Sequence, residues 1–401
     1  MKILLINSVY NIGSTGKIIF TLKKEYESKG HDVFVAYGRY SSIKNDKKIF
    51  KCAYEIESKL CHFISLFTEN IYGNMFFSTI KLIRKIKKIK PDVIHLHCLN
   101  GYFVNIYKLL IFLKKQKINT VLTNHAEFMY TANCGYSIEC NNWIDKRCKN
   151  CKRIKDFNGK FSLNRTYHFY KKMGNAFSSF NSLIVTNVSP WLTNRASKSP
   201  FFQNKKVVTI LNPVNIFDEN VITNPYSNFK INQNSKIILF VTAAYDNKEK
   251  GGFFIPKIAK LLENENYHLF VKSALAPKKI ENLNNVTYIT DQINSKQLAS
   301  LYKYADLTIL LSIRETFSMV VAESLMQGTP VVGFLSGGPE SICLPEYCLF
   351  SKYGDLETFV NNVKITLNKN VDKNAITLKA KEKYSVNTIC NEYLKLYEKN
   401  N

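Results

Sequence analysis

Short apolar segments alternate with helix-like segments along this chain, and that alternation most limits how it can fold. Segments so short and so rich in Val, Ile and Leu are typical of strands buried on both faces of a parallel sheet. In the first half, strands are predicted at 2–7, 32–37, 92–97, 119–125 and 183–187, with a helix at 16–29. In the second half, strands are predicted at 236–242, 268–272, 286–289, 307–312 and 330–334, with helices at 252–263, 296–304, 318–327, 355–367 and 376–399.

This repetition predicts an α/β protein with two doubly wound, Rossmann-like domains in series. The segment Leu211–Asn215, followed by polar residues to Asn234, is interpreted as the junction. We therefore expect an N-terminal domain over 1–210, a C-terminal domain over 211–380, and a last helix over 381–401 that packs back toward the N-terminal domain. Ligands bind such sheets outside the carboxyl ends of the strands, so the two domains are expected to face each other across a cleft.

The charge of the chain favours an anionic partner. Lys and Arg total 56 against 31 Asp and Glu, a formal net charge of +25. Nucleic acid, an acidic membrane surface and a phosphorylated small molecule all fit this charge. A compositional bias toward Lys, Asn and Ile explains it without any partner. The apolar run at Met1–Asn7 is too short for a signal peptide and no run is long enough to span a bilayer, so a cytoplasmic location is expected.

The segment with the clearest chemical content follows the predicted strand at 307–312. Glu315 lies at the carboxyl end of that strand, and the next helix is expected to begin near Ser318. Unpaired amides at a helix N-terminus favour a phosphate or diphosphate, and the Glu323 carboxylate can accept hydrogen bonds from a ribose diol. The substrate-binding residues expected here are Thr316, Phe317, Ser318, Met319 and Glu323. The alternative is a surface helix with two solvated glutamates, but the strand–loop–helix context is much rarer than a chance glutamate pair.

This segment resembles the E-x7-E motif of retaining glycosyltransferases of the GT-B fold, family 4, as found in capsular, exopolysaccharide and lipopolysaccharide synthesis. The resemblance covers nearly the whole chain. Other matching positions, in the order of the family, are Asn7, Gly13-Ser14-Thr15-Gly16, His125, Asn212-Pro213-Val214-Asn215, Lys250-Gly251 and Gly337-Gly338-Pro339-Glu340. By this resemblance Glu315 contacts the hydroxyls of the donor sugar, Glu323 holds the ribose, and the amides near Phe317 and Ser318 hold the diphosphate.

Two further side chains are expected to take part in catalysis. Lys250 follows a strand and can neutralise a departing diphosphate, since a cation at a helix start is disfavoured unless an anion is present. The family usually adds an Arg just upstream; here Lys250 acts alone, or Lys248 or Lys272 substitutes.

His125 ends a strand, and the resemblance implies that it contacts the sugar near the reacting carbon. The family's next residue is Asp, whereas this chain has Ala126. A solvated lysine and a structural histidine are the alternatives.

Glycine-containing loops are expected to bring the backbone close to substrate. Gly13, Ser14 and Gly16 lie between the first strand and the first helix, where glycine permits close approach. This loop is neither a Walker loop nor a G-x-G-x-x-G fingerprint, and a plain turn is equally compatible with it. By the resemblance, Gly337 and Gly338 are also expected to bind substrate.

Four cysteines follow His125 within one loop-like segment, and the last two have C-x2-C spacing. Such a set can close a tetrahedral structural zinc site, although four reduced thiols are the alternative because the first spacings are irregular. The predicted ligands are Cys134, Cys140, Cys148 and Cys151. No cofactor is expected to be required for catalysis itself.

Residues 71–90 combine aromatic and apolar side chains with many lysines, which is typical of helices that lie on an anionic membrane surface. Packing of the same helix on the sheet, with its lysines in solvent, is the alternative. Membrane contact would place the protein peripherally on the inner face of the membrane and would suit a lipid-linked acceptor.

The resemblance implies metal-independent transfer of a hexosyl group, with retained configuration, from a UDP- or GDP-linked sugar to a glycan or lipid-linked saccharide. Two rival functions remain: a basic nucleic-acid-binding α/β protein, and a GT-B enzyme that hydrolyses or epimerises its nucleotide-sugar. The chain has no helix-turn-helix or aromatic sheet motif, and Glu315 and Glu323 would repel phosphate. No nucleic-acid partner is therefore expected.

Overall fold

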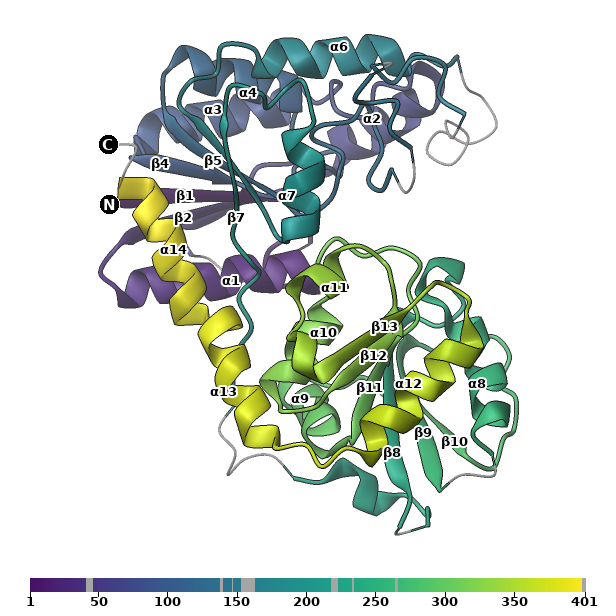
Figure 1. Cartoon of the computed structure of the whole chain (residues 1–401). Coiled ribbons are helices and arrows are strands. Elements are labelled where there is room, and N and C mark those ends of the chain that lie inside the picture. The colour runs from purple at the N-terminus through teal and green to yellow at the C-terminus, as the bar shows by residue number, and fades with distance from the viewer. Residues whose placement is uncertain are drawn as a thin grey trace. The chain divides into compact units, whose positions relative to one another are not determined.

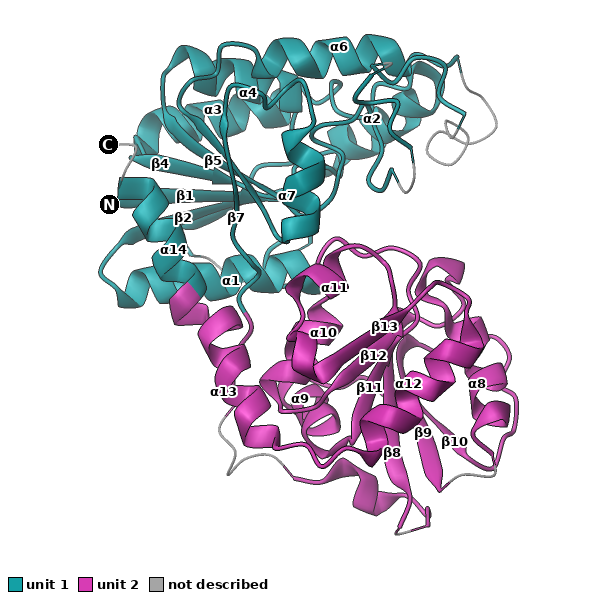
Figure 2. Ribbon diagram, in the orientation of Figure 1, with its two compact units in different colours: residues 1–213, 389–401 teal, residues 214–388 magenta. Residues whose placement is uncertain are grey.

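The computed structural model describes residues 1–40, 46–137, 140–145, 147–152, 163–217, 223–232, 234–263 and 266–398. The chain forms two compact units, which Figure 2 distinguishes by colour. Unit 1 comprises Met1–Pro213 and Ile389–Asn401, and unit 2 comprises Val214–Thr388. Each contains one parallel sheet, so the expected pair of doubly wound domains is confirmed.

The sheet of unit 1 has seven strands in the described residues, in the order β3-β2-β1-β4-β5-β6-β7, and every pairing is parallel. The strands are β1 (Lys2–Asn7), β2 (Asp32–Tyr37), β3 (Ile49–Lys51), β4 (Val93–Leu96), β5 (Asn119–Asn124), β6 (Leu183–Asn187) and β7 (Lys206–Thr209). The helices are α1 (Gly13–Ser28), α2 (Glu55–Thr68), α3 (Phe77–Ile89), α4 (Ile106–Lys115), α6 (Thr166–Phe177), α7 (Pro190–Ser197) and, from Ile389 onward, α14 (Val386–Glu398). Helices α3, α4 and α6 cover one face of the sheet, and α1 and α14 cover the other (Figure 1).

Helix α14 completes the core of unit 1 through buried tyrosines. The Tyr397 hydroxyl lies 2.6 Å from His95 Nδ1 on β4 and 3.2 Å from the Tyr26 hydroxyl on α1. The Tyr393 hydroxyl lies 3.1 Å from Thr123 Oγ1 on β5. Burial raises the pKa of Tyr393 to about 12, so these phenols stay neutral and their hydrogen bonds replace those lost to water. Helix α14 is therefore a structural part of unit 1.

The sheet of unit 2 has six strands in the described residues, in the order β10-β9-β8-β11-β12-β13, again with parallel pairings. The strands are β8 (Lys236–Ala244), β9 (Tyr267–Leu275), β10 (Val286–Ile289), β11 (Leu307–Leu310), β12 (Val331–Phe334) and β13 (Cys348–Ser351). The α-helices are α8 (Ile255–Leu261), α9 (Ser295–Tyr304), α10 (Met319–Met326), α11 (Gly338–Ile342), α12 (Leu356–Asn368) and α13 (Lys373–Tyr384). Short 3-10 turns are η2 (Pro225–Asn228), η3 (Lys248–Lys250), η4 (Gly252–Phe254) and η5 (Pro345–Tyr347).

Alternation along β8 gives unit 2 two hydrophobic layers. Ile238 and Phe240 point to one face and pack with α8 and α12, whereas Leu239 points to the other face and packs with Tyr226 and α9. This follows from the period of two of a strand, so a strand buried on both faces needs apolar residues at every position.

Three details differ from the sequence predictions. Helix α1 begins at Gly13 rather than at residue 16. The helix predicted at 252–263 is the turn η4 followed by the short α8. The single helix predicted at 376–399 is two helices, because Ser385 is extended and the Tyr384 carbonyl accepts a hydrogen bond from Val214 N at 2.9 Å. A contact across so many residues leaves no local signal, which is why the break was missed.

Strands β3, β7 and β13 were also missed. They are three or four residues long, which is too short to show a period. Within the described ranges, no helix has both the length and the apolar character needed to cross a bilayer.

Candidate active site

The strand order of unit 2 reverses between β8 and β11, which are neighbours in the sheet although two strands separate them in the sequence. In open parallel sheets, such a point leaves room for a ligand outside the carboxyl ends of the strands. The loop after β8 carries Lys250, and the loop after β11 carries Glu315. The fold therefore brings together two residues that the sequence analysis assigned separately.

Lys250 and Glu315 form an ion pair. Lys250 Nζ donates to Glu315 Oε1 at 2.6 Å, and the two side chains are 31% and 17% exposed. Among the described residues, Lys250 Nζ is the donor that contacts the Glu315 carboxylate. Both groups thus keep access to solvent and capacity for further hydrogen bonds, as a site for a polar ligand requires.

Two glycines hold three loops together around this ion pair. Gly251 has φ +75°, and a Cβ at this position would overlap the carbonyl oxygen of Leu311. A Cβ on Gly338 would overlap the carbonyl of Thr316 and come within 2.6 Å of Phe317 N. Glycine is required at both positions because backbone approaches backbone.

Backbone hydrogen bonds fix Glu315 itself. Glu315 N donates to the Ser336 carbonyl at 3.0 Å, and the Glu315 carbonyl accepts from Gly338 N at 2.8 Å. Gly337 N donates to Glu340 Oε1 at 2.7 Å, so Glu340 caps the short α11. In this structure Gly337 and Gly338 position the Glu315 loop, and their contact with substrate stays a prediction.

The N-terminus of α10 lies directly after this loop. Ser318 has φ 76°, a strained value for a residue with a side chain, and its Oγ accepts from Val321 N at 3.4 Å. Amides in the first turn of a helix have no acceptor within that helix, so this end of α10 suits an anion; diphosphate binding by the amides near Phe317 and Ser318 stays a prediction. Helix α10 begins at Met319, one residue after the predicted start.

Glu323, the second glutamate of the motif, lies on α10 and is partly buried. It lies close to Tyr302 on α9. The pKa of the Tyr302 phenol is raised well above its usual value, first by burial and second by the charge of Glu323. Thr316 and Phe317 are buried beneath the loop. The predicted donor-binding residues of unit 2 therefore cluster around one end of one sheet.

Of the two cations proposed to assist Lys250, the structure disfavours Lys272. Its Nζ donates to the carbonyls of Ser273 at 2.8 Å and Asp291 at 3.0 Å, and the side chain is buried. Lys248 instead is exposed and lines a hollow of about 450 Å³ together with Tyr245, Asp246 and Phe253. Lys248 is therefore the better placed of the two.

Unit 1 has its own reversal point, between β1 and β4. Asn7 joins the two strand ends, because its Oδ1 accepts from Cys98 N at 3.0 Å and its Nδ2 donates to the Val9 carbonyl at 2.8 Å. Gly13 and Ser14 are exposed at the start of α1, where Gly13 has φ +65°. These residues present an open backbone at this edge of the sheet.

Gly16 differs from the other two predicted residues of the loop. It is buried inside the first turn of α1, and its carbonyl accepts from Asn11 N at 3.0 Å. A Cβ there would lie 3.1 Å from Val9 Cγ2. The conformation of the loop therefore depends on Gly16 for a structural reason, and its predicted substrate contact stays a prediction.

His125 follows β5 and belongs to a group of three histidines. His97 Nδ1 lies 3.1 Å from His125 Nε2, and the ring centroids of His95 and His97 are 3.9 Å apart. Burial lowers the pKa of His125 to about 4, and the pKa values of His95 and His97 also fall well below normal. All three rings are therefore neutral at pH 7.

The hydrogen bonds of His97 indicate its tautomer. His97 Nε2 is buried and has no hydrogen-bond partner in the described part of the chain. A buried N–H without an acceptor costs more than a bare ring nitrogen, so the proton belongs on Nδ1, which donates to His125 Nε2. His125 then carries its own proton on Nδ1. His95 and His97 were not predicted, although the alternation in DVIHLH places His95 on β4 and His97, just after it, on the same side.

Glu127, two residues after His125, has a structural role in this chain. It is fully buried, and its carboxylate accepts from Arg195 Nε at 2.6 Å, Tyr130 Oη at 2.8 Å and Ser137 Oγ at 2.9 Å. These three donors contact Oε1 and Ser137 N contacts Oε2, so both carboxylate oxygens are engaged and the loop after β5 is held in place. Glu127 therefore does not replace the acidic residue that the family has at Ala126.

The four predicted zinc ligands are half-buried thiols. Burial raises the pKa of Cys148 to about 12, and Cys151 and Cys140 are close enough to contribute. Cys134 Sγ instead donates to the Tyr136 carbonyl at 3.3 Å. Across the described ranges, no three His, Cys, Asp or Glu side chains are gathered as a metal site. Zinc binding by these four cysteines therefore stays a prediction.

Comparison with known proteins defines the class to which this fold and site belong. Among solved structures, the chain is similar over 99% of its length to 98% of sucrose-phosphate synthase from Thermosynechococcus elongatus, with a TM-score of 0.68 and 14% identity. It is similar over the full length of both chains to the Anabaena protein HepE in complex with UDP, with a TM-score of 0.65 and 14% identity. These likenesses establish the two-domain GT-B architecture.

Matches to sequence families identify the chain more specifically than the structural likenesses do. The family described as Glycosyltransferase Family 4 matches residues 15–216, and Glycosyl transferases group 1 matches residues 227–383. The chain belongs to glycosyltransferase family 4.

Two curated relatives are more distant. An uncharacterised glycosyltransferase of Methanocaldococcus jannaschii, MJ1607, is 28% identical over 55% of this chain and 61% of its own length. WcaC of Escherichia coli, provisionally named a colanic acid biosynthesis glycosyl transferase, is 21% identical over 67% of this chain and 65% of its own length. The chain thus spans less than two thirds of each relative.

Proposed function

We propose that the protein transfers a hexosyl group from a UDP- or GDP-linked sugar to a hydroxyl of a glycan or lipid-linked saccharide in surface polysaccharide synthesis, with retention of configuration. The observation that carries this proposal is the Lys250–Glu315 ion pair beside the N-terminus of α10, at the reversal point of the unit 2 sheet. The solved complexes of HepE with UDP and with UDP-glucose support the class of donor. The name of WcaC supports a role in polysaccharide synthesis.

In the proposed reaction, the bond between the anomeric carbon and the diphosphate oxygen breaks as the acceptor oxygen bonds to the same face. The acceptor proton passes to the departing phosphate oxygen. We propose that Lys250 and the first amides of α10, rather than a metal ion, stabilise the negative charge that develops. Groups already fixed by Gly251 and by backbone hydrogen bonds are effective in this role because they need little reorganisation.

The two glutamates then have different tasks. Glu315 accepts hydrogen bonds from the sugar hydroxyls with the carboxylate capacity that Lys250 does not use, and Glu323 holds the ribose. His125, which is neutral because of its burial, contacts the transferred sugar near the reacting carbon and does not act as a cation. Gly13 and Ser14 are proposed to border the acceptor.

The test is substitution of the ion pair. Glu315→Ala and Lys250→Ala should each lower the initial rate of transfer by about 10²–10³-fold or more, because each removes a positioned charge. Lys257→Ala, an exposed lysine on α8, is the matched control and should keep the wild-type rate. Circular dichroism should show all three variants folded. Normal turnover in both site variants would refute the assignment.

Product analysis separates transfer from the rival activities of this fold. A transferase should release little free sugar when the acceptor is omitted, whereas a hydrolase should release it at the full rate and an epimerase should return an altered nucleotide-sugar. A thermal-shift screen of nucleotide-sugars should identify the donor by the largest stabilisation.

We also propose that Cys134, Cys140, Cys148 and Cys151 bind a structural zinc ion that pins the loop after His125. Four thiolates would leave no open position, so the ion would stabilise the loop without entering the reaction. Metal analysis of the native and the metal-stripped protein tests this. Less than stoichiometric zinc in the native protein would rule it out.

A further inference from the structure

Helix α2 of unit 1 buries small or polar side chains and exposes large apolar ones. The side chains that it buries are small or polar: Ser58, Cys61 and Ser65. Two of them are hydrogen-bonded to Tyr102, since Ser58 Oγ donates to its carbonyl at 2.7 Å and Ser65 Oγ lies 2.8 Å from its hydroxyl. A helix of a soluble domain normally buries its apolar stripe, so the opposite face needs an explanation.

The outward face of α2 is apolar. Its exposed large residues are between 37% and 84% exposed and recur at intervals of three and four, as one helical stripe requires. They are Ile56, Leu60, Phe63, Ile64, Leu66 and Phe67. A contiguous apolar face of this kind is characteristic of an interaction site rather than of scattered surface residues.

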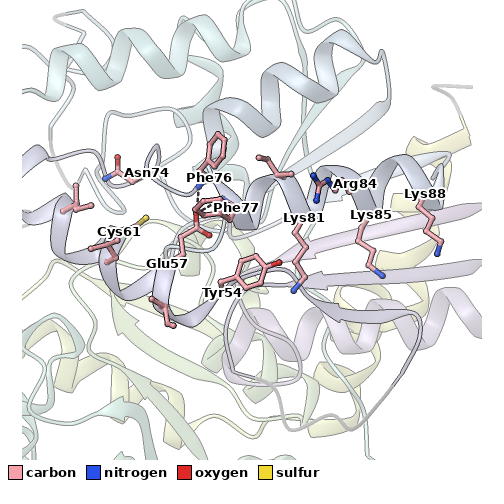
Figure 3. A pocket seen from close by; sticks show the side chains of 14 residues that line it. Tyr54, Glu57, Cys61, Asn74, Phe76, Phe77, Lys81, Arg84, Lys85 and Lys88 are labelled. Carbon is pink, nitrogen blue, oxygen red and sulfur yellow. Dashed lines mark hydrogen bonds between the residues drawn. The ribbon is translucent and has the colours of Figure 1, made fainter.

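Helix α3 supplies the opposite chemistry beside this face. It packs into unit 1 through Leu82 and Ile86, which are buried. One face of this helix therefore packs inside unit 1, as the alternative interpretation expected. Of the stretch 71–90, the helix itself covers Phe77–Ile89. Its other face carries Phe76 and Phe77 at the start, followed by a row of four cations. Figure 3 shows this row, Lys81, Arg84, Lys85 and Lys88, along one side of α3.

The two helices enclose a groove of about 980 Å³, which we call the α2–α3 groove. Ile56, Leu60 and Ile64 line it from α2, and the four cations line it from α3. Glu57 is the acidic residue among its lining side chains, but its carboxylate is occupied at the start of α3. It accepts from the amides of Phe76 at 2.5 Å and Phe77 at 2.8 Å (Figure 3), and from the amide of Ser78 at 2.8 Å. The cations of the groove are therefore not neutralised by it.

Carboxylates hold both ends of α2, so its exposed face is preformed. At the first end, Glu57 ties α2 to α3. At the other end, Glu69 is buried and accepts from Asn164 N at 3.0 Å and Arg165 N at 2.6 Å. These charge-assisted hydrogen bonds fix α2 with its apolar face outward, which is the orientation that an apolar surface partner requires.

We propose that α2 and the start of α3 dock on an anionic phospholipid bilayer, with the apolar stripe of α2 in the acyl boundary and the cations of α3 against the phosphates. A bilayer presents apolar and anionic layers side by side, which matches the two sides of the groove. Nucleic acid would match the cations alone. A second copy of the chain would match the apolar stripe but would bring two rows of cations together. The net charge of +25 adds attraction at longer range.

This inference adds a partner to the proposed function without depending on it. Docking would hold unit 1 at the surface where a lipid-linked acceptor resides. Lipid binding and donor binding are measured separately, so either can fail alone. If nucleotide-sugars neither bind nor react but vesicles still retain the protein, the proposed function fails and the docking surface stands.

The experiment is co-sedimentation of the full chain with vesicles of phosphatidylcholine alone or mixed with phosphatidylglycerol, at low and high salt. The wild type should sediment with the mixed vesicles at low salt and be released by high salt. The triple variant Arg84→Ala, Lys85→Ala, Lys88→Ala should bind about a hundredfold more weakly, since each cation near a charged membrane contributes about fivefold. Ile56→Ser with Leu60→Ser should lose roughly tenfold or more.

The matched control removes the same charge elsewhere. Lys257→Ala, Lys260→Ala and Lys279→Ala are exposed positions of unit 2, and this triple variant should bind vesicles as the wild type does. All variants replace exposed side chains, and circular dichroism checks their fold. The proposal is overturned if the wild type stays in solution with both vesicles or if both triple variants weaken binding equally. Light scattering that shows self-association lost in Ile56→Ser with Leu60→Ser would assign the stripe to a second copy instead.

Discussion

Two glutamates with the same local setting differ in how much of their hydrogen-bonding capacity the protein itself uses. Glu127 follows β5 in unit 1 and Glu315 follows β11 in unit 2, and each lies 2.6 Å from a cation. Glu127 is 0% exposed and its partner Arg195 is 15% exposed, whereas Glu315 and Lys250 are 17% and 31% exposed. Glu127 also has Tyr130 and Ser137 as donors. A carboxylate whose capacity is filled by the protein maintains the fold, and one with unused capacity is available to a ligand.

Glu127→Gln should destabilise unit 1 by about 3–5 kcal/mol, because it leaves the Arg195 guanidinium partly buried without its counter-charge. Denaturant unfolding measures this change. Glu315→Gln, the matched variant in unit 2, should cost less than about 1 kcal/mol, since its ion pair is partly exposed. Equal stability losses in the two variants would contradict the distinction between a structural and a ligand-binding glutamate.

Gly251→Ala tests whether the Glu315 site depends on close loop packing. The added Cβ would overlap the Leu311 carbonyl, and φ is +75°, so we expect a loss of about 2–4 kcal/mol in stability. Donor affinity should fall with it, because Lys250 moves with the loop. Gly135, where a Cβ would meet nothing within 4 Å, is the control in unit 1. Unchanged donor affinity in Gly251→Ala would separate Lys250 from the site.

Acid should loosen unit 1 before unit 2. The pKa values of His95, His97 and His125 are lowered by burial, that of His125 to about 4. A base with a lowered pKa when folded takes up protons preferentially when unfolded, so stability is full above about pH 6.5 and falls as the pH drops toward 4. Each histidine contributes about 1.4 kcal/mol per pH unit in that window.

Hydrogen exchange at pH 7 and pH 5.5, corrected for intrinsic rates, can measure this difference. Peptides from β4 and β5 should lose more protection than peptides from β11 and β12, because His268 is the one histidine in the sequence of unit 2. Its pKa is also lowered by burial, so it supplies an internal comparison. Equal losses in both units would contradict the prediction.

The smallest effect is expected at Ser318. Ser318→Gly relieves the positive φ but removes the hydroxyl that caps Val321 N at 3.4 Å. Since glycine costs only a few tenths of a kcal/mol as a cap, we expect stability to stay within about 0.5 kcal/mol of the wild type. Thermal unfolding measures it. A large loss would show that the Ser318 side chain holds the Glu315 loop more firmly than its single long hydrogen bond indicates.

The parts of the site that the sequence predicted are local. Val- and Ile-rich runs such as KIILFVT mark strands, and Glu315 and Glu323 lie within one strand–loop–helix segment, so their placement needs no distant contact. The parts that were missed join distant residues. Lys250 and Glu315 are 65 positions apart, and Glu127 and Arg195 are 68 apart. No local pattern distinguishes a glutamate that will meet an arginine from one that will not.

By itself, the sequence determined the class of fold, the positions of the main strands along the chain and the segment proposed to bind the donor, because hydrophobic period and turn chemistry act over a few residues. Only the tertiary structure decided how the capacity of each charged group is used. It showed that protein donors occupy the Glu127 carboxylate and that Lys272 donates to backbone carbonyls. It also showed that Lys250 pairs with Glu315 and that α2 has its apolar face outward. Burial and long-range hydrogen bonds decide these outcomes, and they exist only once the sheet has brought its strand ends together.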